Sequence, residues 1–289
     1  MISQLTGEQL GPHLSGVGCL YLKKLDDVDL APTEAQAAAV AAQLRSAGSV
    51  FAEEEAELLL AEAATPGMLR ELVAKRMSGL PLEQILGWAE FCGLRIVVEH
   101  GVFVPRRRTG FMVELAAEFA TSGDIALDLC CGSGAVGAAL ANAVPGVEVY
   151  AADVNSAAVR CARHNLPEDR VFEGDLFDAL PERLAGTIDI LIANAPYVPT
   201  DAISLMPPEA RLYEARIALD GGADGLDVQR RIVAGAGRWL ASGGRLLIET
   251  SVGQAPHTCQ LFVAAGLETT VRHSDDFDST IVIGVLPSQ

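Results

Sequence analysis

The pattern of apolar and polar positions divides the chain into a helical part and a part where strands and helices alternate. Alanine and leucine recur at helical spacing in PTEAQAAAVAAQLRSAG, where Thr33 and Gln36 form a capping box and Gly48 ends the segment. Two more helix candidates follow, AEEEAELLLAEAAT and MLRELVAKRMSG. The spacing therefore predicts a compact helical domain over residues 31–80.

After Pro81 the pattern changes to alternating apolar positions. The stretch GWAEFCGLRIVVEHGVFV alternates about Gly93 and Gly101, as a β-hairpin does. We expect residues 81–109 to form a hairpin linker. Residues 1–30 show no clear period and are expected to be an N-terminal extension, to which we assign no function.

From residue 110 to residue 289 short apolar strands alternate with amphipathic helices. The strand candidates are DIALDLCC, VEVYAADV, RVFEGD, IDILIANA and GRLLIET, and GAVGAALANAV and SAAVRCARHNL are helical stretches between them. Such alternation predicts an α/β domain whose mainly parallel sheet is covered on both faces. The last two candidates, LETTVRHS and STIVIGVL, are separated only by DDFD and predict an antiparallel pair at one edge.

Composition excludes several classes of protein. Half of the 289 residues are hydrophobic, yet no charge-free run of eighteen apolar residues and no secretory signal occurs, so we expect a cytoplasmic protein without a membrane span. A net charge of −17 argues against nucleic acid as a partner. The six cysteines and five histidines lack C-x-x-C and H-E-x-x-H spacing, so no metal site is predicted.

The carboxyl ends of the predicted strands carry the candidate ligand-binding residues, because open parallel sheets bind ligands there. The first end reads LDLCCGSGAVG, where Asp128 and Cys130 precede Gly132 and Gly134. Glycines before a helix let a ligand approach the backbone and leave helix amides available. The spacing does not fit the dinucleotide-binding pattern of glycines, so this loop alone indicates little.

The next two strand ends add acidic residues. Asp153, followed by Val154, stands where a carboxylate can accept both hydroxyls of a ribose. Asp175, followed by the apolar Leu176, suits an exocyclic amine on a flat base. Each acid alone could equally be a helix cap or turn former. Together, without a Lys-Ser/Thr phosphate loop, they favour a cationic nucleoside, and we predict S-adenosylmethionine as the cofactor.

The fourth strand end, NAPY, contains the candidate catalytic residues, and Asn194 is also a candidate cofactor-binding residue. The side-chain oxygen of Asn194 and the carbonyl of Ala195 could accept the two N–H bonds of a planar nitrogen and leave its lone pair aimed at a methyl donor. Pro196 restricts the turn, and Tyr197 could stack on the acceptor. The amide of Asn194 also suits a carboxamide acceptor, whose oxygen needs a donor. The alternative is an ordinary Asn-Pro turn.

With these residues in place, the sequence resembles the protein-glutamine N-methyltransferase family that modifies translation release factors. NAPY is a version of the [D/N]-P-P-Y sequence of methyltransferases that act on planar nitrogens. PLEQILGWAEFCGLRIVVEHGVFVPR and EARIALDGGADGLDVQRRI are similar to the family's linker hairpin and to the segment after its catalytic loop. The likeness spans roughly residues 33–285.

The resemblance implies a helical unit that recognises a protein substrate, a hairpin linker and a Rossmann-like seven-stranded class I methyltransferase domain over residues 110–289. It implies that Asp128, Gly132 and Gly134 line the cofactor site, that Asp153 holds the ribose, and that Asp175 and Leu176 lie beside the adenine. Asn194 to Tyr197 would form the acceptor-amide site. The expected activity is methylation of a protein glutamine, with a translation release factor as the expected partner.

Two positions depart from the family pattern. Ala195 stands where the family usually has a second proline, although its carbonyl is kept. Residues 105–109 read PRRRT instead of PRPET, so Arg106, Arg107 and Arg108 bear on the choice of substrate or form a solvated turn. Two other functions stay open. One is a nucleic-acid methyltransferase acting on adenine or cytosine amino groups, and the other is a cofactor-binding module without turnover.

Overall fold

The computed structural model describes residues 34–288, in two compact units that divide after Leu69. In the first unit, α1 (Glu34–Ser46) and α2 (Ala52–Glu62) bury Leu44 and Leu59. The third helix, α3 (Pro66–Met77), begins in the last residues of this unit. The three predicted helices are therefore confirmed. The prediction for residues 1–30 lies outside the described residues.

The second unit contains the predicted hairpin. After the short helix α4 (Leu82–Leu86), β1 (Trp88–Phe91) pairs antiparallel with β2 (Leu94–Val97). Gly93 makes the turn between them with φ of 77°, a left-handed conformation that a side chain disfavours. The hairpin is confirmed about Gly93, whereas residues 98–106 form no strand.

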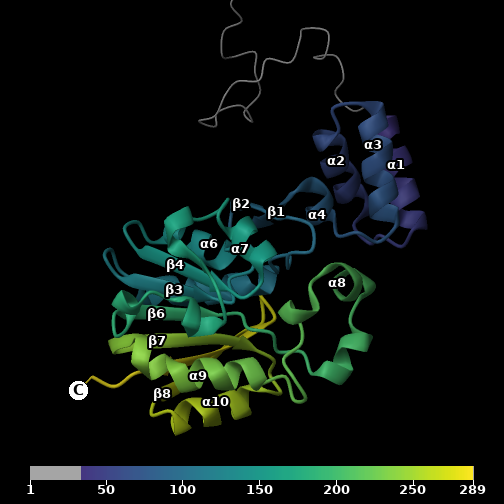
Figure 1. Ribbon diagram of the computed structural model, residues 1–289. Coiled ribbons are helices and arrows are strands. Elements are labelled where there is room, and N and C mark those ends of the chain that lie inside the picture. Colours follow the sequence, from purple (N-terminus) through teal and green to yellow (C-terminus); the bar gives the residue numbers. More distant parts are fainter. Residues whose placement is uncertain (1–33, 289) are drawn as a thin grey trace, which may run out of the picture. The chain divides into compact units, whose positions relative to one another are not determined.

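Seven strands form one sheet in the order β5-β4-β3-β6-β7-β9-β8 (Figure 1). The pairs from β5 to β7 are parallel, and β9 joins β7 and β8 antiparallel. This confirms the mainly parallel sheet and its antiparallel edge pair. The strands are β3 (Ile125–Leu129), β4 (Glu148–Asp153), β5 (Val171–Glu173), β6 (Ile188–Ala193), β7 (Leu240–Thr250), β8 (Glu268–Ser274) and β9 (Ser279–Val285).

Helices cover both faces of this sheet, as predicted. Successive strand residues alternate between two apolar clusters: Ala126 and Ile192 pack on one face, and Leu127 and Leu191 on the other. Figure 1 shows α6 and α7 on one side of the sheet and α9 and α10 on the other. The helices are α5 (Gly110–Phe119), α6 (Ala135–Ala143), α7 (Ser156–Ala162), α8 (Pro208–Tyr213), α9 (Asp227–Trp239) and α10 (Ala255–Ala264).

Short 3₁₀ turns complete the described chain: η3 (Arg107–Thr109), η4 (Glu168–Arg170), η5 (Leu176–Ala179), η6 (Glu182–Leu184), η7 (Thr200–Leu205) and η8 (Arg216–Ala218). Within residues 34–288 no helix is both long enough and apolar enough to cross a bilayer. The same residues contain no group of three or more histidine, cysteine, aspartate or glutamate side chains arranged to hold a metal ion.

Candidate active site

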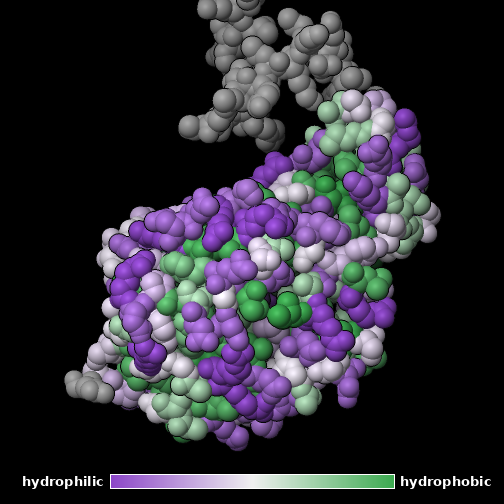
Figure 2. All heavy atoms as spheres, in the orientation of Figure 1, coloured by the Kyte–Doolittle hydropathy of each residue, from purple (hydrophilic) through white to green (hydrophobic). Residues whose placement is uncertain are grey.

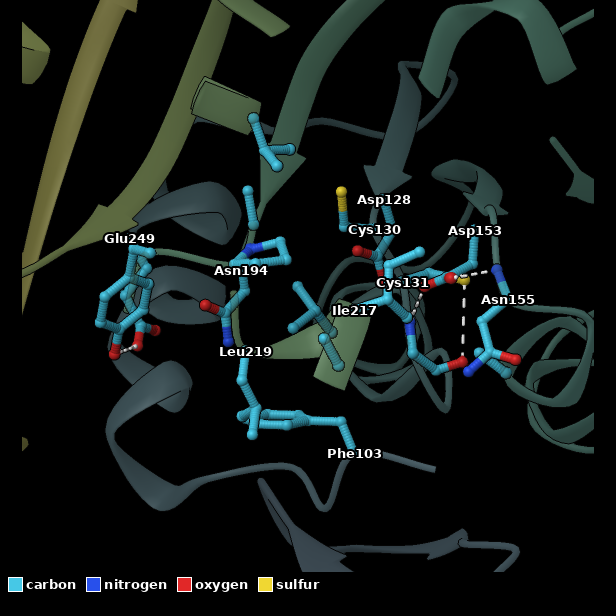
Figure 3. A pocket seen from close by; sticks show the side chains of 18 of the residues that line it. Phe103, Asp128, Cys130, Cys131, Asp153, Asn155, Asn194, Ile217, Leu219 and Glu249 are labelled. Atoms are coloured by element: carbon cyan, nitrogen blue, oxygen red, sulfur yellow. Dashed lines mark hydrogen bonds between the residues drawn. The ribbon is translucent and has the colours of Figure 1, made fainter. Parts of the chain in front are cut away.

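A pocket of about 330 Å³ opens at the carboxyl ends of the central strands. It brings together almost all of the predicted site residues. Figure 3 shows Asn194 between Glu249 on one side and Asp153 and Asn155 on the other. The predicted residues that line it are Asp128, Cys130, Gly132, Asp153, Val154, Asp175, Leu176, Asn194, Ala195, Pro196 and Tyr197.

Gly134 was predicted with these residues but is not among those that line the pocket. It precedes α6 with φ of 75°, and a Cβ at this position would lie 3.0 Å from Leu166 Cδ1 and 3.2 Å from Ala162 Cβ. The structure thus requires glycine here for its backbone conformation and for the close packing of α6 against α7.

Asp153, at the end of β4, ties together two of the loops that line the pocket. Its Oδ2 accepts a hydrogen bond from the Gly132 amide at 2.9 Å, and its Oδ1 accepts one from the Asn155 amide at 2.8 Å. Burial raises the pKa of Asp153, and these backbone bonds offset part of the rise. Each carboxylate oxygen keeps a second acceptor position, so both can still bind a hydroxyl.

Asp128, the fourth residue of β3, is buried. Its Oδ2 accepts a hydrogen bond from the Gly137 amide in α6 at 2.9 Å. Burial raises the pKa of Asp128 to about 7, while the Gly137 bond lowers it and the nearby Asp153 raises it further. The ionised form of this carboxyl is therefore costly in the folded protein, in contrast to an exposed aspartate.

Replacement of Asp128 by Asn should change how stability depends on pH. The pKa of Asp128 is higher in the folded protein than in the unfolded chain. The free energy of unfolding of the wild type therefore falls as pH rises from the ordinary aspartate value of 3.8 through the folded-state value of about 7. Asparagine does not ionise. The stability of Asp128→Asn relative to wild type should therefore increase by roughly 1–2 kcal/mol between about pH 6 and pH 8. Urea unfolding at both pH values measures this, and parallel pH curves for the two proteins would contradict it.

Asp175 lines the pocket, and it already has one partner. Its Oδ2 accepts a hydrogen bond from Arg231 Nη2 at 2.8 Å, and both side chains are about half exposed. Arg231 comes from α9 and also lines the pocket. Sequence reasoning missed Arg231, because only the fold shows that this turn of α9 faces the loop after β5.

The NAPY loop follows β6 directly and is braced by the segment between β6 and α9. The Val198 amide donates to the Leu219 carbonyl at 3.1 Å, and the Gly221 amide donates to the Val198 carbonyl at 2.9 Å. A Cβ on Gly225, whose φ is 78°, would lie 2.3 Å from the Tyr197 carbonyl oxygen. The segment EARIALDGGADGLDV therefore packs against the NAPY loop and forms hydrogen bonds with the residue that follows it, and its glycines allow this close approach.

Glu249, which the sequence reasoning missed, is the residue before the last in β7 and lies beside the NAPY loop. Its side chain is 2% exposed, and its Oε1 accepts a hydrogen bond from the Tyr197 hydroxyl at 3.4 Å (Figure 3). Burial raises the pKa of Glu249, and burial with the Glu249 charge raises that of Tyr197 to about 12. An acid at the end of LLIET was the available signal, but its relevance depends on β7 lying next to β6.

The three arginines of PRRRT have different surroundings. Arg106 forms an ion pair of 2.6 Å with Glu214, whose side chain is fully buried and also accepts from the Val104 amide. Arg107 lies over the ring of Phe277, 5.9 Å from its centroid. Arg108 is exposed and lines the pocket. The alternative of a simple solvated turn is therefore wrong for Arg106, which pairs with a buried carboxylate.

Apolar side chains also reach the pocket surface. Ile217 and Val154 line it and are about half exposed. Figure 2 shows exposed apolar groups beside a hollow on the face in view. The pocket thus combines acidic groups, an amide and apolar surface, which suits a ligand with a flat ring and a polar sugar better than a highly charged one.

Comparison with known proteins supports this description. The methyltransferase small domain family model matches residues 93–223. The chain is 39% identical over 201 residues to the release factor glutamine methyltransferase of Geobacter sulfurreducens, covering 68% of this chain and 70% of that protein. It is 35% identical to the 4-amino-L-phenylalanine/4-methylamino-L-phenylalanine methyltransferase of Streptomyces pristinaespiralis, covering 67% and 69%.

A solved structure also shares the fold. A methyltransferase from Pyrococcus furiosus matches with a TM-score of 0.51 and 17% identity, over 68% of this chain and 90% of that one. This likeness supports the Rossmann-like class I methyltransferase architecture that the strand order indicates. Together with the pocket at the carboxyl ends of β3, β4 and β6, the extent and identity of the match to the Geobacter protein show that this chain belongs to the release factor glutamine methyltransferase family.

Proposed function

We propose that this protein transfers the methyl group of S-adenosylmethionine to the side-chain amide nitrogen of a protein glutamine, and that its substrate is a translation release factor. The observation that carries the proposal is the position of Asn194 and Ala195, at the end of β6 in the same pocket as Asp153. Relatives named as release factor glutamine methyltransferases support the choice of substrate.

The pocket residues fit the cofactor. Asp153 keeps acceptor positions for ribose hydroxyls, and the second oxygen of Asp175 accepts no hydrogen bond within residues 34–288, so it is available to an exocyclic amine. The Gly132 loop lets the ligand approach the backbone closely. The acidic side chains suit a cationic ligand, and when bound S-adenosylmethionine supplies the sulfonium methyl group.

Asn194 and Ala195 would hold the acceptor nitrogen. Within the described part of the chain, neither the Asn194 side-chain oxygen nor the Ala195 carbonyl accepts a hydrogen bond. Both can therefore accept the N–H bonds of an incoming amide. An amide nitrogen is a weak nucleophile because its lone pair is delocalised, so fixing both hydrogens orients that lone pair and raises the rate of transfer. Tyr197, held by Glu249, would contact the planar acceptor.

The remaining assignments are part of the same proposal. The N-terminal domain predicted over residues 31–80 would recognise the protein substrate. Residues 81–109 would link it to the methyltransferase domain of residues 110–289, and the protein would act in the cytoplasm. The net charge of −17 supports a protein acceptor over nucleic acid.

Mass spectrometry of candidate release factors tests the proposal. Purified factors are incubated with this protein and S-adenosylmethionine, and we expect one glutamine to gain the mass of a methyl group. Asn194→Ala is the matched control and should modify that glutamine far more slowly under the same conditions. Radiolabelled cofactor offered to protein, RNA and DNA together separates the alternatives, and label found only in nucleic acid would refute the protein substrate.

A second acceptor class is an aromatic amine. The Streptomyces relative named for 4-amino-L-phenylalanine matches over a similar share of this chain as the Geobacter protein. An aryl amine also has two N–H bonds and a delocalised lone pair, so Asn194 and Ala195 would hold it in the same way. Methylation of free 4-aminophenylalanine, without any methylation of release factors, would favour this class over glutamine.

A further inference from the structure

We propose that Thr109 and Glu249 are positioning residues that hold the Asn194 amide with its oxygen turned toward the methyl acceptor. This inference rests on the proposed function of Asn194 and extends it to two residues outside the NAPY loop. The three side chains come from different elements: Thr109 precedes α5, Asn194 follows β6, and Glu249 is in β7.

The orientation of this amide decides whether the site can work. The oxygen and the NH2 group of asparagine are almost equal in size, so packing hardly distinguishes the two orientations. With the oxygen toward the pocket, Asn194 accepts an N–H of the substrate. With the NH2 group there, two donors would face each other. A hydrogen-bond partner behind Asn194 must therefore fix the orientation.

Thr109 is that partner. The Asn194 Nδ2 donates to the Thr109 Oγ1 at 3.2 Å. Thr109 is 2% exposed and stands at the start of α5, but its side chain makes no capping hydrogen bond to that helix. Its hydroxyl is thus not occupied by the local backbone, as it commonly is at this position. Because a hydroxyl both donates and accepts, the direction of its own proton sets what Asn194 must offer.

Glu249 fixes the direction of the Thr109 proton. The Glu249 Oε1 accepts from the Tyr197 hydroxyl at 3.4 Å, and its buried Oε2 accepts no hydrogen bond from residues 34–288. Thr109 lines the same pocket as Glu249, and its hydroxyl is the donor that we assign to Oε2. A buried carboxylate oxygen without a partner needs a donor, because leaving a buried acceptor unsatisfied is costly. The Thr109 proton therefore points to Glu249, and its oxygen is left to accept from the Asn194 NH2 group. The orientation of the Asn194 amide is therefore set by the Glu249 acceptor, acting through the Thr109 hydroxyl.

The strand pattern explains why these groups meet. Ile192 and Leu247 belong to the core cluster on the α5 side of the sheet. Asn194 and Glu249 each lie two residues further along and so point to that same face, on the adjacent strands β6 and β7. Thr109, directly before α5, lies over the ends of both strands.

A pair of substitutions at Thr109 tests the proposal. Thr109→Val keeps the shape of the side chain and removes the hydroxyl, and we expect kcat to fall about tenfold with cofactor affinity unchanged. Thr109→Ser keeps the hydroxyl and should restore most of the rate. Equal loss in Thr109→Val and Thr109→Ser would indicate packing alone, and a wild-type kcat in Thr109→Val would overturn the proposal.

NMR gives a readout that does not depend on the substrate. The side-chain amide signals of Asn194 are identified as those missing from Asn194→Ala. Their exchange with solvent should be slow in wild type and in Thr109→Ser, and fast in Thr109→Val. If glutamine is not methylated but this difference is seen, the proposed substrate fails while the positioning role stands. Equal exchange in wild type and Thr109→Val would overturn the positioning role whatever the substrate.

Discussion

Asn194→Ala should lower kcat for methyl transfer by about 10²–10³-fold, the usual loss when one preorganised polar group is removed from a transition-state site. The substitution removes the side-chain oxygen that would accept an N–H of the substrate and leaves the Ala195 carbonyl as the remaining acceptor. Cofactor affinity should change little, because Asp153, which holds the Gly132 amide, lies on the other side of the pocket from Asn194 (Figure 3).

Two measurements separate these effects. Single-turnover rates at saturating cofactor give the chemical step, and calorimetry gives the affinity for S-adenosylmethionine. Asn194→Asp is an informative companion, because it keeps an acceptor oxygen but loses the NH2 group that donates to Thr109. It should be slower than wild type and still bind cofactor. Full activity in Asn194→Ala would refute the proposed geometry of the acceptor site.

Asp153→Ala should weaken cofactor binding by about 1–3 kcal/mol through the loss of charge-assisted hydrogen bonds. The carboxylate would bind the ribose and already holds the Gly132 and Asn155 amides. Its removal therefore loses contacts to the ligand and also loosens two loops that line the pocket. The rate of transfer at saturating cofactor should fall much less than the affinity.

Calorimetric titration with S-adenosylmethionine checks this result. Asp153→Asn serves as the control, since it retains one acceptor oxygen and the size of the side chain and should bind with intermediate affinity. Arg231→Ala is a second comparison, because Arg231 holds Asp175 at the other end of the pocket. An affinity unchanged in Asp153→Ala would exclude Asp153 from the cofactor site.

Much of the fold could be predicted from the sequence because local pattern and three-dimensional structure agree. The strands around Asp128, Asp153 and Asn194 are short apolar runs that end at a polar residue, and parallel strands bring such ends to one edge. The gathering of these residues in one pocket follows from that rule. Helical spacing likewise predicted α1, α2 and α3.

The pocket residues that the sequence analysis missed have roles that depend on how segments far apart in the sequence pack together. Glu249 looks like any acid at the end of a strand until β7 is placed beside β6. Thr109 and Arg231 reach the pocket from segments 85 residues before Asn194 and 56 residues after Asp175. Gly134 was predicted to line the cofactor site, and the close approach of Leu166 and Ala162 shows that it also has a packing role, which the sequence did not reveal.

The ion pair between Arg106 and the buried Glu214 divides the PRRRT sequence into one constrained position and two adaptable ones. A carboxylate removed from water needs its counter-charge, so exchange of Arg106 would leave Glu214 uncompensated in the interior. Arg107 and Arg108 are exposed, and neither forms an ion pair with a buried carboxylate within residues 34–288. Divergence toward new methyl acceptors can therefore proceed at these two positions without endangering the fold, and libraries aimed at altered selectivity should randomise them first.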